Sequence, residues 1–153
     1  MISHASYTVD VRSLDEFSAR ELYALLKLRV DVFVVEQACP YEELDGKDDG
    51  ALHLRMMHAS DLMAAARILP PVDGKNPRIG RVVVSPYYRG KRLGEAVIRE
   101  ALAICADRFR GIDVEISAQS HLQRFYGGLG FVAISEEYFE DGIPHVDMVR
   151  SSS

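Results

Sequence analysis

A short stretch of the chain, VVVSPYYRGKRLGEAV at residues 82–97, has the residue types of an anion-binding turn. Its first residues are β-branched and favour a strand, and its last residues favour a helix. The turn between them contains three cations and two glycines: Arg89, Gly90, Lys91, Arg92 and Gly94. The first N–H groups of a helix lack partners, glycine lets a backbone approach a ligand, and cations bind phosphate oxygens. The turn therefore predicts a pyrophosphate-binding site, and the alternative is a solvated basic turn.

Three other motifs do not offer a competing site. No Walker loop occurs, because G-x-x-x-x-G-K-[ST] is absent. GLGFVA at 128–133 follows a predicted helix and precedes a predicted strand, which is the reverse of a dinucleotide-binding turn, so its glycines are expected to end the helix. DGKDDG at 45–50 is not a calcium loop, since Lys47 and Met56 stand at ligand positions.

Composition narrows the class of protein. The 153 residues carry a net charge of −5 with a pI near 5.5, which argues against general nucleic-acid binding. No apolar run approaches the length of a membrane span, and the N-terminus lacks the pattern of a secretory signal. The only cysteines, Cys39 and Cys105, are far apart, which favours a reduced, cytoplasmic protein.

Periodicity and capping signals predict the elements that position the basic turn. Strands are expected at 7–11, 52–58, 62–69, 78–85, 113–118, 131–135 and 145–149. Helices are expected at 18–34, 92–108 and 121–130, the first and third opened by capping boxes at Ser18–Glu21 and Ser120–Gln123. Residues 136–144 are expected to form an acidic turn. The order β-α-β-β-β-α-β-α-β-β predicts an α/β domain whose mixed, mostly antiparallel sheet has one parallel step and helices on both faces.

With the basic turn at its centre, this element order resembles the Gcn5-related N-acetyltransferase (GNAT) family over nearly the whole chain. That family's phosphate-binding pattern is R/Q-x-x-G-x-G/A; Arg89 and Gly94 match its ends, and Arg92 replaces its middle glycine. Three stretches are similar to the ElaA-type subgroup: LYALLKLRVDVFVVEQACPYEELDGKD, AQSHLQRFYGGLGF and YFEDGIPH. The resemblance implies the GNAT acyl-CoA N-acyltransferase fold and a single domain at residues 3–150.

The resemblance also implies acetyl-CoA as co-substrate and an amine, on a small molecule or a peptide, as acceptor in a ternary complex with direct transfer. No metal is implied. The donor-binding residues would be Val82, Val83, Val84, Arg89, Gly90, Lys91, Arg92, Leu93 and Gly94. The strand residues among them would offer backbone groups to the pantetheine arm and the thioester carbonyl, where an N–H stabilises the developing oxyanion.

Two residues are candidates for proton transfer. Tyr126 stands where many GNAT members place a tyrosine that protonates the departing thiolate, although its apolar helical stripe also fits a core tyrosine. His145 is the candidate base, because histidine ordinarily changes charge near neutral pH, and a strand-edge histidine is the alternative. Other candidates for the base, or for holding a water that acts as one, are Glu36, His121, Glu140 and Asp141.

Several interpretations stay open at this level. Arg29 could pair with Glu36 or be solvated, and both Arg29 and His53 are expected to be structural. The acidic run 42–49 could attract a cationic acceptor or form a solvated face. Two functional alternatives are a CoA-binding sensor that does not transfer and a nucleotide-binding module. A homodimer is compatible with the resemblance, because dimers are common in the fold.

Overall fold

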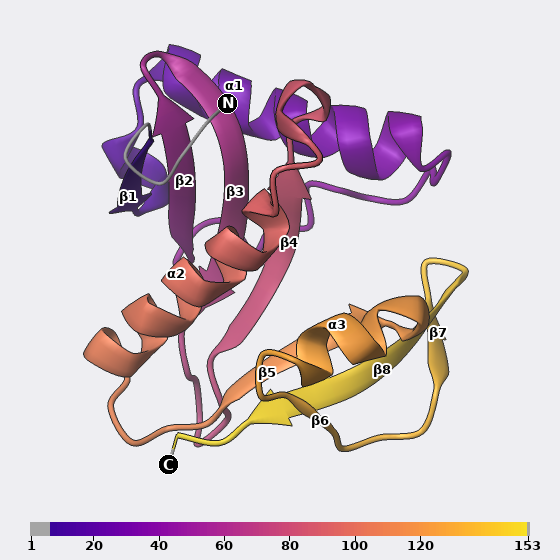
Figure 1. Cartoon of the computed structure of the whole chain (residues 1–153). Coiled ribbons are helices and arrows are strands. Elements are labelled where there is room, and N and C mark those ends of the chain that lie inside the picture. Colours follow the sequence, from indigo (N-terminus) through magenta and orange to yellow (C-terminus); the bar gives the residue numbers. More distant parts are fainter. Residues whose placement is uncertain (1–6, 153) are drawn as a thin grey trace.

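One mixed sheet of eight strands spans the part of the chain that the structure describes, with the strand order β1-β2-β3-β4-β5-β8-β6 and β7 paired to β8. The computed structural model describes residues 7–152 (Figure 1), so residues 3–6 of the expected domain lie outside the described residues. The strands are β1 (Thr8–Arg12), β2 (Leu52–His58), β3 (Asp61–Leu69), β4 (Arg78–Val84), β5 (Val114–Gln119), β6 (Val132–Ala133), β7 (Tyr138–Glu140) and β8 (Ile143–Arg150). Within these bounds only β4 and β5 pair in parallel, which confirms the single parallel step.

The helices lie on both faces of this sheet. They are α1 (Ala19–Val30), continued by a π-helical segment (Asp31–Glu36), then α2 (Leu93–Arg108) and α3 (Gln123–Gly127), with 3-10 turns at Leu14–Glu16, Pro86–Tyr88 and Ser120–Leu122. The capping box of α1 is confirmed: Glu21 N–H donates to Ser18 Oγ at 3.1 Å, and Ser18 N–H donates to the Glu21 carboxylate at 2.9 Å. These bonds satisfy backbone donors that a helix start otherwise leaves without partners.

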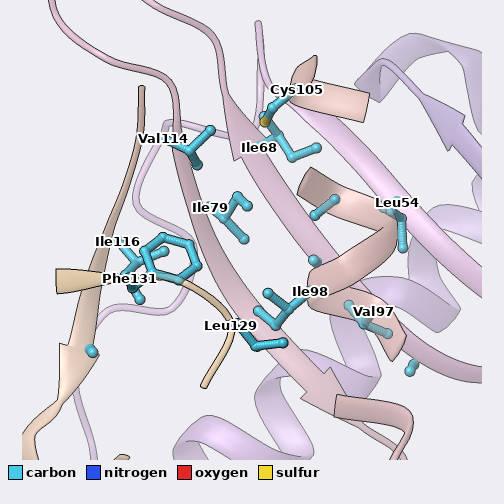
Figure 2. Packing of buried hydrophobic residues seen from close by; sticks show 14 of the residues in the cluster. Leu54, Ile68, Ile79, Val97, Ile98, Cys105, Val114, Ile116, Leu129 and Phe131 are labelled. Carbon is cyan, nitrogen blue, oxygen red and sulfur yellow. The ribbon is translucent and has the colours of Figure 1, made fainter. Parts of the chain in front are cut away.

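Two apolar clusters hold the helices against the sheet. Leu25 and Val32 pack on Ala65 and Val83 at one face. At the other face, side chains of α2 meet those of the strands, with Leu129 and Phe131 after α3 completing the cluster (Figure 2). Because neighbouring strand residues alternate between faces, α1 lies on one side of β3 and β4, and α2 lies on the other.

The third helix differs from the prediction. It is limited to Gln123–Gly127, and a 3-10 turn precedes it. The expected capping box is wrong, since Leu122 stands at the N-cap without a side-chain bond and the Ser120 hydroxyl is buried with no partner among the described residues. The prediction that glycines end this helix is confirmed, because Gly127 is its last residue, Gly128 is its C-cap and Gly130 has φ 96°.

A strand also replaces the expected acidic turn at 136–144. Tyr138–Glu140 pairs with the start of β8, with Glu140 opposite Ile143. The two residues between them, Asp141 and Gly142, have φ 53° and 75°. Positive φ at both positions is the conformation of a two-residue hairpin turn, for which Asp-Gly is a preferred sequence. This hairpin brings residues 140–145 beside the end of β5, where His145 pairs with Gln119.

None of the helices described within 7–152 has the length and apolarity needed to cross a membrane.

Candidate active site

A cleft opens where β4 and β5 separate. The two strands pair only through Arg78 with Glu115 and Ile79 with Ile116. Beyond these positions they diverge (Figure 1), and a cavity of about 740 Å³ lies between them. Residues of β4, β5, the π-helical segment, the acidic run 42–49 and the β7–β8 hairpin line this cavity. The loss of pairing between two central strands therefore creates room for a ligand inside the sheet.

Strand β4 bulges at the start of this divergence. Ala65 pairs with Val83 and Arg67 pairs with Gly80, so β4 has one residue more than β3 between these positions. Arg81 has φ 49° in the left-handed region, which disfavours a side chain by about 1–2 kcal/mol. Among the described strands, none pairs with the β5-facing edge of β4 beyond Ile79. Backbone N–H and C=O groups on that edge can therefore bind a ligand.

The basic turn after β4 has the backbone shape of an anion-binding loop. Gly90 has φ 83°, a conformation that favours glycine. Helix α2 begins at Leu93 without a side-chain cap, so its first N–H groups stay available. A Cβ added at Gly94 would meet only Val84 Cγ2, at 4.0 Å. Internal packing does not demand glycine at this position, and the open first turn of the helix fits a phosphate group.

The three cations of this turn differ in their surroundings. Both terminal nitrogens of Arg89 donate to the Glu36 carboxylate, Nη2 to Oε2 at 2.8 Å, and its Nε donates to the Val84 carbonyl at 3.3 Å. Lys91 and Arg92 are exposed and form no ion pair within residues 7–152. Two cations are therefore free to meet an anion, whereas Arg89 is shared with an acid at the end of the π-helical segment.

The three valines of β4 and Leu93 pack into the two apolar clusters. Val83 is buried against α1, Leu93 is buried in the α2 cluster, and Val82 and Val84 pack against the same cluster. Of the three valines, Val82 also lines the cleft. Their side chains thus position β4, whose edge beyond Ile79 carries backbone polar groups without a strand partner among the described strands.

Tyr126 lies in the cleft wall. Its ring contacts Phe131 edge-on, with 5.9 Å between centroids, and Phe125 at 5.1 Å. Burial raises the pKa of the Tyr126 phenol, so the hydroxyl stays protonated at neutral pH. Among the described residues none is hydrogen-bonded to this hydroxyl. The ring therefore packs as a core residue does, and the hydroxyl keeps its proton without a hydrogen-bond partner among residues 7–152.

His145 lies on β8 in the same cleft and is largely buried. Its Nδ1 is 2.7 Å from the Ile143 carbonyl, and since a carbonyl only accepts, this nitrogen carries a proton. In the neutral ring Nε2 is then the basic nitrogen, and it lies 3.5 Å from Glu140 Oε2. The ring stacks on Tyr138. These contacts fix one orientation of the imidazole, with Nδ1 on the Ile143 carbonyl and Nε2 toward Glu140.

The other candidates for the base divide into two groups. His121, Glu140 and Asp141 line the cleft with His145. Glu36 does not line it and binds Arg89 instead. Arg29 neither pairs with Glu36 nor is solvated, so both alternatives are wrong; it is buried and bound to Glu43 and Asp48, which agrees with a structural role.

Three of the five acids in the run 42–49 are neither solvated nor free to attract a cation, whereas Glu42 and Asp49 are exposed. The three buried or half-buried carboxylates pair with three arginines, in the contacts Arg29–Glu43, Arg29–Asp48, Arg67–Asp45, Arg67–Asp48, Arg81–Glu43 and Arg81–Asp45. His53, also buried, has Nε2 3.0 Å from the Asp48 carbonyl, which agrees with a structural role. Arginines inside the apolar strands 62–69 and 78–85 were the available signal, since a buried arginine needs a carboxylate partner.

The sequence model of the protein family described as acetyltransferase (GNAT) domain matches residues 15–152. The chain belongs to the GNAT family. Protein ElaA of Escherichia coli (strain K12) is 44% identical over 138 residues, which cover 88% of this chain and 90% of that protein. This match supports the ElaA-type resemblance.

Solved structures agree with the GNAT assignment. An acyl-CoA N-acyltransferase from Pseudomonas aeruginosa superposes with a TM-score of 0.91 at 43% identity, covering 95% of this chain and 100% of that chain. The crystal structure of Escherichia coli ElaA superposes with a TM-score of 0.87 at 40% identity, covering 95% and 99%. The GNAT acyl-CoA N-acyltransferase fold expected from the sequence is thus confirmed.

Arg92, which departs from the GNAT loop pattern, has the backbone conformation of the glycine it replaces. Arg92 stands at the middle glycine of the pattern and has φ 57°. The backbone therefore takes a left-handed conformation that glycine favours, although a side chain is present.

Within residues 7–152, no group of three or more His, Cys, Asp or Glu side chains is arranged to hold a metal ion.

Proposed function

We propose that this GNAT protein transfers an acetyl group from acetyl-CoA to an amine, with both substrates bound at once. The observation that carries the proposal is the unpaired edge of β4, which leads directly into the basic turn and borders the cleft that Tyr126 and His145 line. Similarity to an acyl-CoA N-acyltransferase at 43% identity supports the reaction class.

The donor would use both parts of this surface. Its pyrophosphate fits the first turn of α2, where Lys91 and Arg92 are free of ion pairs and Gly94 leaves space. Its pantetheine amides would bond the open edge of β4 at Val82, Val83 and Val84, much as an added strand pairs with a sheet edge. The thioester would then lie at the bulge, beside the cleft.

The chemistry requires two proton transfers. The amine nitrogen attacks the thioester carbonyl, a C–N bond forms and the C–S bond breaks. His145 Nε2 would accept a proton from the attacking nitrogen, directly or through a water. Tyr126 would donate its phenolic proton to the CoA thiolate and be reprotonated from solvent. A backbone N–H on the β4 edge would stabilise the oxyanion between these steps.

The acceptor would be an amine on a small molecule or a peptide that enters from the side of the β7–β8 hairpin. Three cleft-lining acids there, Glu42, Glu140 and Asp141, form no ion pair with lysine or arginine among residues 7–152. These acids would favour a protonated amine as it approaches. A cytoplasmic location and a homodimer remain predictions.

An acceptor screen tests the proposal. Wild-type protein is incubated with acetyl-CoA and a panel of amino acids, polyamines and short peptides, and free CoA and acetylated amine are both quantified. We expect one acceptor class to give equal amounts of both products. His145→Gln should lower kcat and be partly rescued at high pH, where more of the amine is already neutral. CoA binding without turnover for the whole panel would favour a sensor, and ATP binding in place of CoA would favour a nucleotide-binding module.

A further inference from the structure

The bulge of β4 is held in an unfavourable conformation. Arg81, at its first position, has φ 49°, where this kind of bulge usually has glycine. A strained residue persists only when the surrounding structure fixes it, and such residues cluster at functional sites. The question is which contacts fix Arg81.

The side chain of Arg81 supplies the anchor. Its Nε donates to Glu43 Oε2 at 2.7 Å, and its Nη2 donates to the Glu43 carbonyl at 3.2 Å and to Asp45 Oδ2 at 3.3 Å. The Glu43 side chain is 7% exposed, so solvent screens its contacts little. The bulge is therefore tied to the acidic run 42–49 by three bonds from one guanidinium.

The acidic run is itself fixed on two other elements. Arg29, at the end of α1, donates from Nε to the same Glu43 oxygen at 2.7 Å, and its Nη1 donates to Asp48 at 2.7 Å. Arg67 on β3 holds Asp45 through two bonds of 2.9 Å. Three arginines and three carboxylates thus connect α1, β3 and the bulge of β4, and their formal charges balance.

We propose that the Arg81–Glu43 pair positions β4 for acyl transfer, and this inference rests on the proposed function. The pair holds the bulge, and the bulge sets the direction of the backbone groups of Val82, the bulge residue beside the open edge. Arg81 and Glu43 act through the backbone and touch no reacting atom. Losing the pair should harm the transition state more than donor binding, because most donor contacts lie farther along the loop and α2.

Variants of Arg81 separate the ion pair from the backbone strain. Arg81→Gly removes the side-chain anchor and tolerates the left-handed conformation. Arg81→Ala also removes the anchor but keeps the backbone strain. Arg81→Lys keeps the positive charge but not the guanidinium geometry. Glu43→Gln removes the charge from the other side. Arg55→Gln is the matched control, because Arg55 is a buried β2 arginine that pairs with Asp10 at 2.6 Å and does not line the cleft.

Kinetics and infrared spectroscopy provide the measurements. For Arg81→Gly and Glu43→Gln we expect kcat to fall at least tenfold while the Kd of acetyl-CoA changes less than about threefold, since one oxyanion donor is worth about 10²–10³ in kcat. Arg81→Lys should recover part of the loss. The carbonyl stretch of bound ¹³C-labelled acetyl-CoA should lie below its value in water in wild type and move toward that value in Arg81→Gly. Arg55→Gln should lower Tm and keep kcat within about twofold.

A wild-type kcat and carbonyl frequency in folded Arg81→Gly would overturn the inference, as would an equal loss of kcat in Arg55→Gln. If Arg81→Gly does not fold, Arg81→Lys and Glu43→Gln decide by the same criteria. The infrared measurement needs no acceptor, so it tests the positioning of the donor even if the amine screen finds no turnover. Failure of the proposed function is thereby distinguished from failure of this inference.

Discussion

The guanidinium of Arg89 is bound to the carboxylate of Glu36, 53 residues earlier in the chain, with Nη2 2.8 Å from Oε2. This contact joins the start of the phosphate-binding pattern to the end of the π-helical segment. Both side chains are more than two-fifths exposed, at 42% and 43%, so the pair can open at little free-energy cost. A phosphate that binds Arg89 must share it with Glu36 or displace it.

Substitutions of these two residues should therefore act in opposite directions. Arg89→Ala removes a charge-assisted phosphate contact and should weaken CoA binding about 10- to 150-fold. Glu36→Gln removes the competing acid and should tighten CoA binding by up to about fivefold. Calorimetric titration with CoA at two salt concentrations measures both effects, and added salt should narrow the gap between wild type and Arg89→Ala. Wild-type affinity in Arg89→Ala would remove this residue from the donor site.

Tyr126→Phe separates the catalytic interpretation from the core interpretation. The ring keeps its contacts with Phe125 and Phe131, and the hydroxyl has no hydrogen-bond partner among the described residues, so stability should change by less than about 1 kcal/mol. If the phenol protonates the thiolate, kcat and kcat/KM should both fall at least tenfold while donor KM stays near wild type. Full turnover in a well-folded Tyr126→Phe protein would leave this tyrosine with a packing role alone.

The arginine–carboxylate cluster should make the fold sensitive to acid. Burial alone would raise the pKa of Asp45, but the hydrogen bonds from Arg67 and from Lys47 N–H outweigh it and hold the pKa below the ordinary value of 3.8. A carboxyl with a lowered folded-state pKa stabilises the fold above its unfolded-state pKa, and this stabilisation is lost as the pH falls toward the folded-state value.

Melting temperatures of wild type and Asp45→Asn test this linkage. Wild type should be clearly more stable at pH 7, and the difference should shrink as the pH falls below about 4. Asp49→Asn is the control, because Asp49 is exposed and forms no ion pair within residues 7–152. A difference between wild type and Asp45→Asn that stays constant from pH 7 to pH 3 would contradict the assignment of this carboxylate to the ion-pair cluster.

The two cysteines should differ in reactivity. Burial raises the pKa of the Cys105 thiol to about 11, and this side chain is 1% exposed. Cys39 is partly exposed in the cleft wall. Iodoacetamide at pH 8 should therefore label one thiol in the native protein, and Cys39→Ser should abolish that labelling until the protein is denatured. Labelling of both thiols in the folded wild type would show that the core around Cys105 is open.

Local signals in the sequence predicted most of the elements. Ser18 and Glu21 are three residues apart and cap α1, and the β-branched run before Ser85 forms β4. The Asp141–Gly142 pair is an equally local signal for a hairpin turn. The many acidic residues at 136–144 favoured the prediction of a turn over the whole segment, so the strand at Tyr138–Glu140 was not predicted. The three-residue spacing of Ser120 and Gln123 predicted a capping box that does not form, because Ser120 lies inside a 3-10 turn and its hydroxyl is buried.

The cleft could not be predicted in the same way. The contacts that hold it join residues 14 to 38 positions apart, as in Arg29–Glu43 and Arg81–Glu43, and spacing along one element does not reveal such pairs. The bulge depends on the register between β3 and β4, which the sequence pattern of either strand leaves undetermined. The residue types at 89–94 predicted an anion-binding turn, and the structure added the Arg89–Glu36 contact and the arginine–carboxylate cluster that holds the bulge of β4.

The most direct test of the account is a calorimetric comparison of CoA and ATP binding to wild type and to Gly94→Trp. A Cβ added at Gly94 would meet only Val84 Cγ2, at 4.0 Å, so a side chain can begin there without a backbone clash, and a tryptophan would obstruct the first turn of α2. We expect CoA to bind wild type, ATP at the same concentration not to displace it, and Gly94→Trp to lose CoA binding while keeping its Tm within a few degrees. CoA affinity equal to wild type in Gly94→Trp, or displacement of CoA by ATP, would contradict an acyl-CoA site at this turn.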